Sequence, residues 1–108
     1  MVDDLKAAGV DVVACVSVAD AYVMKAFGVH LGMQAAGIQC LGDPEGLWAK
    51  ALGIAVDCGP YGMGGAPRNK RFGLVAKDGV IKYFGVEDGG KGFDKTTGTA
   101  LLMAVEGL

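Results

Sequence analysis

The chain lacks the features of several specialised classes of protein. No uninterrupted apolar run approaches the ~20 residues that a membrane-spanning helix needs, so we expect no membrane partner. The formal net charge is −2, which gives no basic surface for a nucleic acid. The N-terminus, Met-Val-Asp-Asp, is acidic and is typical neither of a signal peptide nor of a transit peptide.

Metal ligands and paired cysteines are also scarce. The chain has a single histidine, His30, and three cysteines, Cys15, Cys40 and Cys58, of which no two have C-x-x-C spacing. This pattern supports neither a disulfide framework nor a zinc site, so we expect no metal and no cofactor. Reduced thiols favour a cytoplasmic location, while targeting to an organelle stays open if the N-terminus is incomplete.

The chain is short and rich in hydrophobic residues. It has 108 residues, of which 52% are hydrophobic and 20% charged, and 19 are glycines that cluster at expected turns. Such a chain can form one small core, so we predict a single domain over residues 1–108.

Apolar runs of strand length occur four times. Residues 11–18 form a β-branched run that is typical of a strand buried on both faces, and residues 38–41 form a shorter one. Residues 71–76 and 80–86 flank Asp78-Gly79, which is a strong hairpin signal. Residues 58–67, rich in glycine and proline, are expected to form an irregular loop.

Helix signals separate these strands. Residues 5–8 resemble a last helical turn that ends at Gly9, and Asp20, Asp43 and Thr97 are suitable caps for three further helices. Two of these helices carry an expected buried face. Those faces comprise Tyr22, Val23, Ala26, Phe27, His30 and Leu31 in one helix, and Leu47, Trp48, Ala51 and Leu52 in the next. We therefore expect His30, Trp48 and the methionines to be packed in the core.

The predicted order β-α-β-α-β-β-α is that of the C-terminal part of an α/β, thioredoxin-like fold. Six segments along the whole chain resemble the type 5 peroxiredoxins of the redoxin superfamily, in order and at compatible spacing. They are residues 5–10 (LKAAGV), 13–18 (VACVSV), 22–25 (YVMK), 43–44 (DP), 70–72 (KRF) and 78–83 (DGVIKY). The resemblance implies a partial redoxin domain that lacks the N-terminal strands and the start of the peroxidatic helix.

The resemblance also implies an activity and partners. Members of this family are antioxidant peroxidases that reduce hydrogen peroxide and alkyl hydroperoxides with a peroxidatic cysteine. Thioredoxin, glutaredoxin or glutathione then reduces the enzyme again. A helix N-terminus and an arginine lower the pKa of that cysteine, because the thiolate is the nucleophile. By resemblance, Arg71 is this arginine, and it also polarises the peroxide.

None of the three cysteines fits the peroxidatic motif of the family, Pro-x-x-x-Thr/Ser-x-x-Cys. The residues three and seven positions before Cys15 are valine and alanine, and neither Cys40 nor Cys58 has the required residues. We therefore expect the peroxidatic position to lie upstream of Met1, and the chain alone to have weak or no peroxidase activity.

The cysteines that are present have other expected roles. Cys15 lies among valines and Cys40 lies in a strand, so both are expected to be packing residues. Some plant members carry a resolving cysteine at the position of Cys15, which leaves a secondary redox role open for it. Cys58, in the glycine-rich loop, is the cysteine that we expect to be most exposed, and it is the other candidate for a secondary redox role.

In the family, a central strand separates residues 12–18 from the hairpin at 71–86, and we expect this chain to lack it. Unpaired backbone groups cost ~1–3 kcal/mol each, so an open gap is disfavoured. Either the two parts pair directly, or another chain donates a strand, or exposed edges associate; we favour closure or association. The alternatives to an enzyme are therefore a non-catalytic module that pairs with itself or a full-length homologue, and an incomplete gene product.

Overall fold

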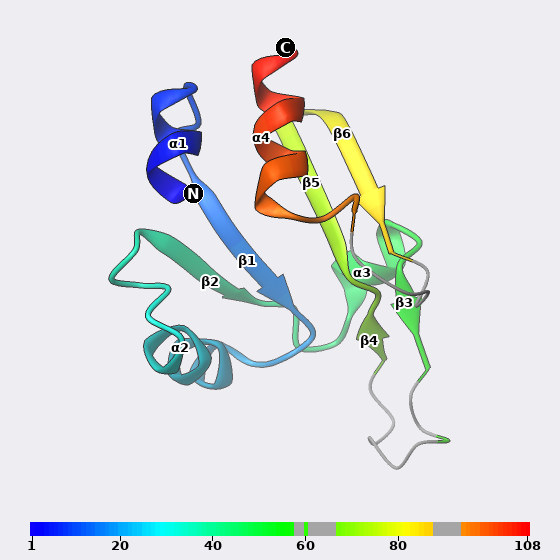
Figure 1. Ribbon diagram of the computed structural model, residues 1–108. Coiled ribbons are helices and arrows are strands. Elements are labelled where there is room, and N and C mark those ends of the chain that lie inside the picture. Colours follow the sequence, from blue (N-terminus) through cyan, green and yellow to red (C-terminus); the bar gives the residue numbers. More distant parts are fainter. Residues whose placement is uncertain (58–59, 61–66, 88–93) are drawn as a thin grey trace. The chain divides into compact units, whose positions relative to one another are not determined.

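The computed structural model describes residues 1–57, 60, 67–87 and 94–108 (Figure 1). Its helices are α1 (Val2–Ala7), α2 (Ala21–His30), α3 (Leu47–Ala51) and α4 (Gly98–Glu106). Its strands are β1 (Val13–Ser17), β2 (Ile38–Gly42), β3 (Ala55–Val56), β4 (Arg68–Asn69), β5 (Phe72–Lys77) and β6 (Val80–Val86). These include every element that the sequence predicts, together with β3 and β4, which it does not predict.

The chain divides into two compact units. One unit comprises residues 12–69, and the other comprises residues 1–11 and 70–108. Within the described residues the strands form three two-stranded sheets, β1-β2, β3-β4 and β5-β6. The three arrangements considered above for the missing strand concern how the units meet, and they stay predictions, as does the single domain.

The unit of residues 12–69 is built on a parallel β-α-β arrangement. β1 and β2 pair from Val13 opposite Ile38 to Ser17 opposite Gly42, and α2 connects them. Asp20 caps α2 as expected, because its carboxylate accepts a hydrogen bond from the backbone N–H of Val23 at 2.8 Å. The end of β1 is held by β4, since Val18 donates its N–H to Asn69 Oδ1 at 3.2 Å and accepts a hydrogen bond from Arg68.

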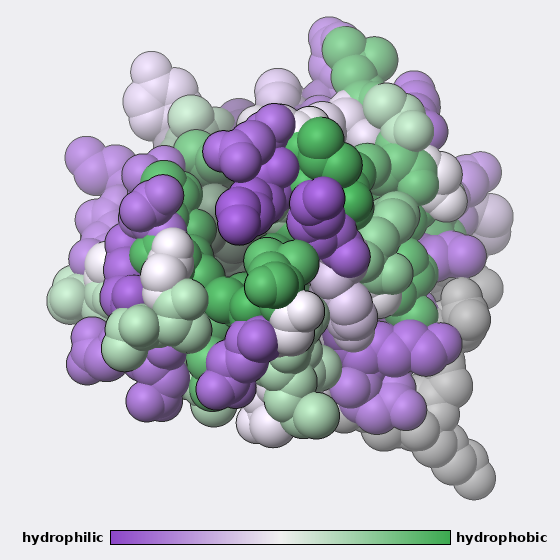
Figure 2. Space-filling model, turned by 90° about the horizontal axis from the view of Figure 1, so that it is seen from above, coloured by the Kyte–Doolittle hydropathy of each residue, from purple (hydrophilic) through white to green (hydrophobic). Residues whose placement is uncertain are grey.

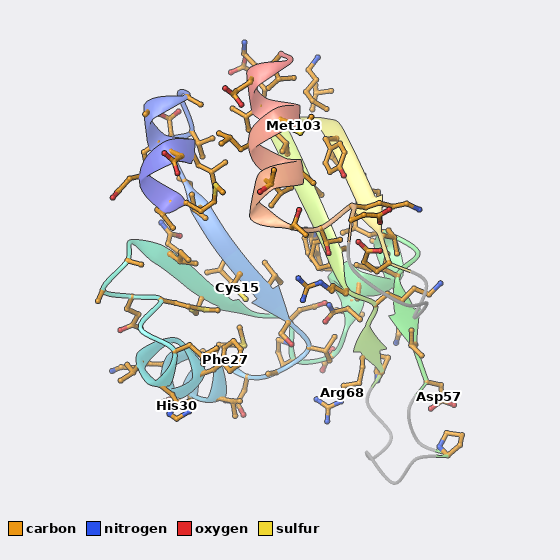
Figure 3. All side chains as sticks on the ribbon, in the orientation of Figure 1. Cys15, Phe27, His30, Asp57, Arg68 and Met103 are labelled. Carbon is orange, nitrogen blue, oxygen red and sulfur yellow. The ribbon has the colours of Figure 1, made fainter. Side chains whose placement is uncertain are left out.

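The predicted buried face of α2 is wrong. Met24 is 2% exposed and Gly28 is buried, whereas Tyr22 is 86% exposed, and the other residues of the expected stripe, including His30, are exposed too. The physical reason is close packing at Gly28, where a Cβ would lie 2.7 Å from Cys40 Sγ on β2. The helix therefore turns its Met24 and Gly28 side to the sheet, and Figure 3 shows His30 projecting away from it.

The predicted packing of α3 is also wrong in part. Ala49 is the buried residue of this helix, while Leu47, Trp48 and Ala51 are exposed. The helix begins later than predicted, with Gly46 as its N-cap at φ 68°. Asp43 nevertheless serves the helix start, because its two carboxylate oxygens accept the N–H groups of Trp48 and Ala49 at 3.2 and 3.0 Å.

The predictions that the methionines and the first strand are buried hold only in part. Met24 is in the core with Val18, Ala49 and Ile54, but Met1 and Met103 are exposed, which contradicts the expectation for the methionines. Ala14 of β1 is exposed, so this strand is not buried on both faces. Hydrophobic residues accordingly reach the molecular surface among hydrophilic ones in Figure 2.

The other unit contains the predicted hairpin. β5 and β6 pair antiparallel around a turn at Asp78 and Gly79, whose φ angles of 52° and 79° are those of a two-residue type I′ connection. Phe72 and Phe84 contact edge to face, with ring centroids 6.4 Å apart. α4 begins at its predicted cap, because Thr97 Oγ1 accepts the N–H of Ala100 at 3.1 Å.

A pair of glycines lets the segment before α4 lie on this hairpin. Gly73 and Gly85 are register partners. A Cβ on Gly85 would lie 2.7 Å from the carbonyl oxygen of Lys95, and a Cβ on Gly73 would lie 3.4 Å from the Cα of Thr96. The absence of side chains at both positions brings the backbone of residues 95–96 onto the hairpin.

Candidate functional site

The site is built around Arg71, immediately before β5. Its backbone carbonyl accepts a hydrogen bond from the N–H of Glu87 at 3.0 Å, which continues the β5-β6 ladder by one step. Its guanidinium Nε donates to the Oγ1 of Thr96 at 2.8 Å. Both the backbone and the side chain of Arg71 are therefore fixed within one unit.

Glu87 organises the segment that presents Thr96. One carboxylate oxygen, Oε1, accepts the backbone N–H groups of Asp94 and Lys95 at 3.0 and 2.7 Å, and the hydroxyl of Thr96 at 3.3 Å. Tyr83 adds a hydrogen bond from its hydroxyl to the carbonyl oxygen of Lys95 at 2.5 Å. Together with the glycine pair, these bonds place Thr96 beside Arg71.

The Thr96 hydroxyl connects a cation to an anion. It accepts from Arg71 and donates to Glu87, and Thr96 is only 8% exposed. The N–H of Lys95 is the largest cause that lowers the pKa of Glu87 below its usual range, helped by the N–H of Asp94 and by Thr96. Glu87 is therefore a carboxylate at neutral pH and keeps the hydroxyl oriented toward Arg71.

Such an arginine can recognise an oxygen-rich ligand. A guanidinium presents several N–H donors in one plane and stays charged at every physiological pH. Fixing it by one N–H reduces the conformational entropy that binding would otherwise cost. The geometry thus suits the binding of an anion, or the polarisation of an oxygen atom in a substrate.

The three cysteines are placed unequally. Cys15 on β1 and Cys40 on β2 are free, half-buried thiols and are direct register partners. Burial, and then the neighbouring Cys40, raise the pKa of the Cys15 thiol. Cys58 lies outside the described residues. Cys15 and Cys40 belong to one unit and Arg71 to the other.

The residues described contain no group of three or more histidine, cysteine or acidic side chains that could hold a metal ion. Sequence reasoning missed Glu87, Tyr83 and Thr96, the residues that position Arg71. No local signal marks them, since they are ordinary polar residues whose roles depend on contacts far apart in the chain. Within the same described residues, no helix has the length and apolar character that crossing a membrane requires.

Comparison with known proteins identifies the family. The family model described as Redoxin matches residues 1–102. This chain belongs to the Redoxin family. Among curated relatives it is 39% identical over 102 residues to "Peroxiredoxin-2E-2, chloroplastic" of rice, Oryza sativa subsp. japonica, with 94% of this chain and 45% of the relative covered.

Solved structures agree with this assignment. The redoxin chain superposes on reduced Prx3 of Vibrio vulnificus in complex with H₂O₂ with a TM-score of 0.81 and 38% identity, covering 96% of this chain and 62% of that one. It also superposes on peroxiredoxin 5 of Alvinella pompejana with a TM-score of 0.82 and 28% identity, covering 98% and 63%. The expected α/β, thioredoxin-like fold and the resemblance to peroxiredoxins are thereby confirmed.

The redoxin chain spans about half the length of the curated relatives that it matches. The names of the relatives include chloroplastic and mitochondrial proteins, and the cytoplasmic location stays a prediction.

Proposed function

We propose that this redoxin takes part in thiol-dependent reduction of hydroperoxides, with Arg71 as the arginine that binds and polarises the peroxide. The observation that carries this proposal is the Nε hydrogen bond from Arg71 to Thr96, which Glu87 supports from the other side. A fixed guanidinium can stabilise the negative charge that develops on the leaving oxygen when a thiolate attacks a peroxide. That the related Prx3 has been crystallised with H₂O₂ supports the choice of substrate.

We further propose that the 108 residues alone have weak or no peroxidase activity. Arg71 can assist the reaction only if a reactive thiolate is supplied, and none of the three cysteines fits the peroxidatic motif given above. The raised pKa of Cys15 also disfavours its thiolate at neutral pH. The nucleophile is then supplied from outside these 108 residues, and the reductant is thioredoxin, glutaredoxin or glutathione.

A peroxide-consumption assay with excess dithiothreitol tests the activity of the chain. The expected rate is close to that of dithiothreitol alone, for the wild-type chain and for Cys15→Ser and Cys58→Ser variants. Rapid turnover that disappears in the Cys58→Ser variant would show that the chain carries its own nucleophile and would overturn the proposal.

A chimera tests the role of Arg71. The part of the rice relative that precedes its matched segment would be fused ahead of residue 1, as the expected source of a peroxidatic cysteine. We expect the fusion to reduce hydrogen peroxide, and an Arg71→Met variant of it to lose about 10²-fold or more in kcat/KM, as for a lost electrostatic contact to the transition state. An active fusion whose kcat/KM is unchanged by Arg71→Met would contradict the assigned role.

The alternative is a non-catalytic module that pairs with a second copy, with a full-length homologue or with a donated strand. The exposure of large apolar side chains on α2 favours it, since the side chains of Tyr22, Val23 and Phe27 lie at the surface. Light scattering coupled to size-exclusion chromatography tests the pairing with itself. A monomer across the micromolar range would leave self-association without support.

A further inference from the structure

Two cysteines are directly paired on neighbouring strands of the parallel sheet in residues 12–69. Cys15 on β1 is the register partner of Cys40 on β2, and both are free (Figure 3 labels Cys15). Register partners in a parallel pair project their side chains from the same face of the sheet. Cys40 Sγ lies against Gly28 of α2, so both thiols lie on the side of the sheet that α2 covers.

The spacing of these residues suits a disulfide. Neighbouring strands are about 4.8 Å apart, which falls inside the range of about 4.4–6.8 Å that Cα atoms of disulfide-linked cysteines occupy. In keeping with this placement, Cys40 raises the pKa of Cys15, as an effect second to that of burial.

The contact that the sulfur of Cys40 makes with Met33 is weak. The sulfur is 3.7 Å from the Sδ of Met33, and rotation about χ1 gives up this contact at little cost. The sulfur lies in the space that the missing side chain of Gly28 leaves, since a Cβ there would be 2.7 Å from it. Rotation of Cys40 toward β1 would bring its sulfur to Cys15.

We propose that Cys15 and Cys40 form a redox-active dithiol that a hydroperoxide converts into a disulfide between β1 and β2. In the first step, one thiolate attacks the peroxide, the O–O bond breaks, and a sulfenic acid and water (or an alcohol) form. In the second step, the other thiol attacks this sulfur, an S–S bond forms and water leaves. Two thiols are oxidised and one hydroperoxide is reduced. This oxidation is slow, so that it adds little to the rate at which dithiothreitol alone consumes peroxide.

A disulfide between directly paired strands is easily reversed. The Cβ atoms of a disulfide are normally about 3.8 Å apart, closer than strand pairing holds them, so the bond is strained. Strained disulfides are the labile ones that small thiols reduce. This dithiol therefore stores two electrons reversibly, independently of Arg71, and oxidation removes the thiol of Cys15 from any other exchange.

A Cys58→Ser chain isolates the pair, because it retains only Cys15 and Cys40. The folded protein is treated with one equivalent of hydrogen peroxide, alkylated under denaturing conditions and digested with trypsin. Cleavage after Lys25 places the two cysteines on separate peptides, residues 7–25 and 26–50. We expect these peptides to be linked, free thiols to fall from two per chain to none, and dithiothreitol to restore both, all in a monomer.

A matched control moves one thiol to the opposite face of β1. In a Cys15→Ser, Ala14→Cys, Cys58→Ser chain the new thiol is exposed, and its register partner is Gln39. This control should form no intramolecular link. The proposal is overturned if the Cys58→Ser chain keeps both thiols, oxidises each separately to sulfinic acid, or links only between two molecules.

If the Cys58→Ser chain fails to fold, the same digest of the wild-type chain shows whether Cys15 and Cys40 become linked. Cys58 then lies on a third peptide, residues 51–68, so its alkylation is counted separately. A link between peptides 7–25 and 26–50 supports the proposal, and links that involve peptide 51–68 instead would contradict it.

Discussion

Arg71 Nε donates a hydrogen bond to Thr96 Oγ1 across 2.8 Å, although the two residues are 25 positions apart in the chain. The bond joins the start of β5 to the segment that leads into α4. It exists because Gly73 and Gly85 let that segment lie on the hairpin and because Glu87 holds its N–H groups. The orientation of the candidate peroxide-binding arginine is therefore a property of this whole unit.

Removing the hydroxyl of Thr96 should loosen Arg71 and weaken the unit. Thr96→Val keeps the shape of the side chain but leaves Arg71 Nε without this acceptor and Glu87 without this donor. A hydrogen bond to a charged group contributes about 1.5–3 kcal/mol, so we expect the free energy of unfolding to fall by about 2 kcal/mol in a urea titration.

The control is Thr99→Val, the same substitution at an exposed position of α4. It should change the free energy of unfolding by no more than about 0.5 kcal/mol. Equal effects of the two substitutions would show that the Arg71–Thr96–Glu87 network contributes nothing to stability.

The lowered pKa of Glu87 predicts how the stability of the protein depends on pH in the acidic range. The backbone N–H of Lys95 is the main cause of the shift, followed by that of Asp94 and the Thr96 hydroxyl. A carboxyl whose pKa is lower when folded adds stability above its unfolded pKa and loses it as the pH falls through the folded pKa. Stability should therefore decline as the pH is lowered below the usual range of a glutamate.

Glu87→Gln should flatten this decline, because the amide does not titrate. Thermal unfolding followed at a series of acidic pH values measures it. Glu45→Gln, which removes the same charge from an exposed loop, is the control, and it should flatten the decline less than Glu87→Gln does. A slope that is unchanged by Glu87→Gln would refute this account.

Local signals in the sequence predicted much of the fold. The hairpin at Asp78-Gly79 and the caps at Asp20 and Thr97 depend on residues within a few positions of each other. A short stretch of sequence is therefore enough to predict them. By contrast, β3 and β4 are two residues each, too short to produce a periodic pattern. Arg71 was found by family resemblance, but the bonds that orient it come from distant segments.

The buried side of α2 shows why packing is harder to predict than the element itself. The helix carries apolar residues around most of its surface, so periodicity selects the wider stripe of Tyr22, Phe27 and Leu31. The side that packs is chosen instead by a small residue, Gly28, that admits the thiol of Cys40. A hydropathy pattern does not mark a glycine as the position that packs against the sheet.

Two substitutions distinguish these sides of α2. Met24→Ala removes a side chain that is 2% exposed, and should cost about 2–5 kcal/mol of unfolding free energy through lost burial and the cavity left behind. Tyr22→Ala, at 86% exposure, should cost no more than about 0.5 kcal/mol. The reverse order in a denaturant titration would mean that the predicted stripe is the packed side after all.

A substitution of Asp43 tests how the start of α3 is stabilised. Its carboxylate accepts the N–H groups of Trp48 and Ala49, although Gly46 occupies the cap position. Asp43→Ala leaves two N–H groups at the positive end of α3 without these acceptors, and capping losses are typically about 1 kcal/mol. Trp48 is the only tryptophan, so its fluorescence in a urea titration reports directly on this helix. Glu45→Ala, a neighbouring carboxylate in the same loop, is the control, and it should leave the midpoint unchanged. If both substitutions lower the midpoint equally, the loss reflects negative charge near the helix start and not the two hydrogen bonds of Asp43.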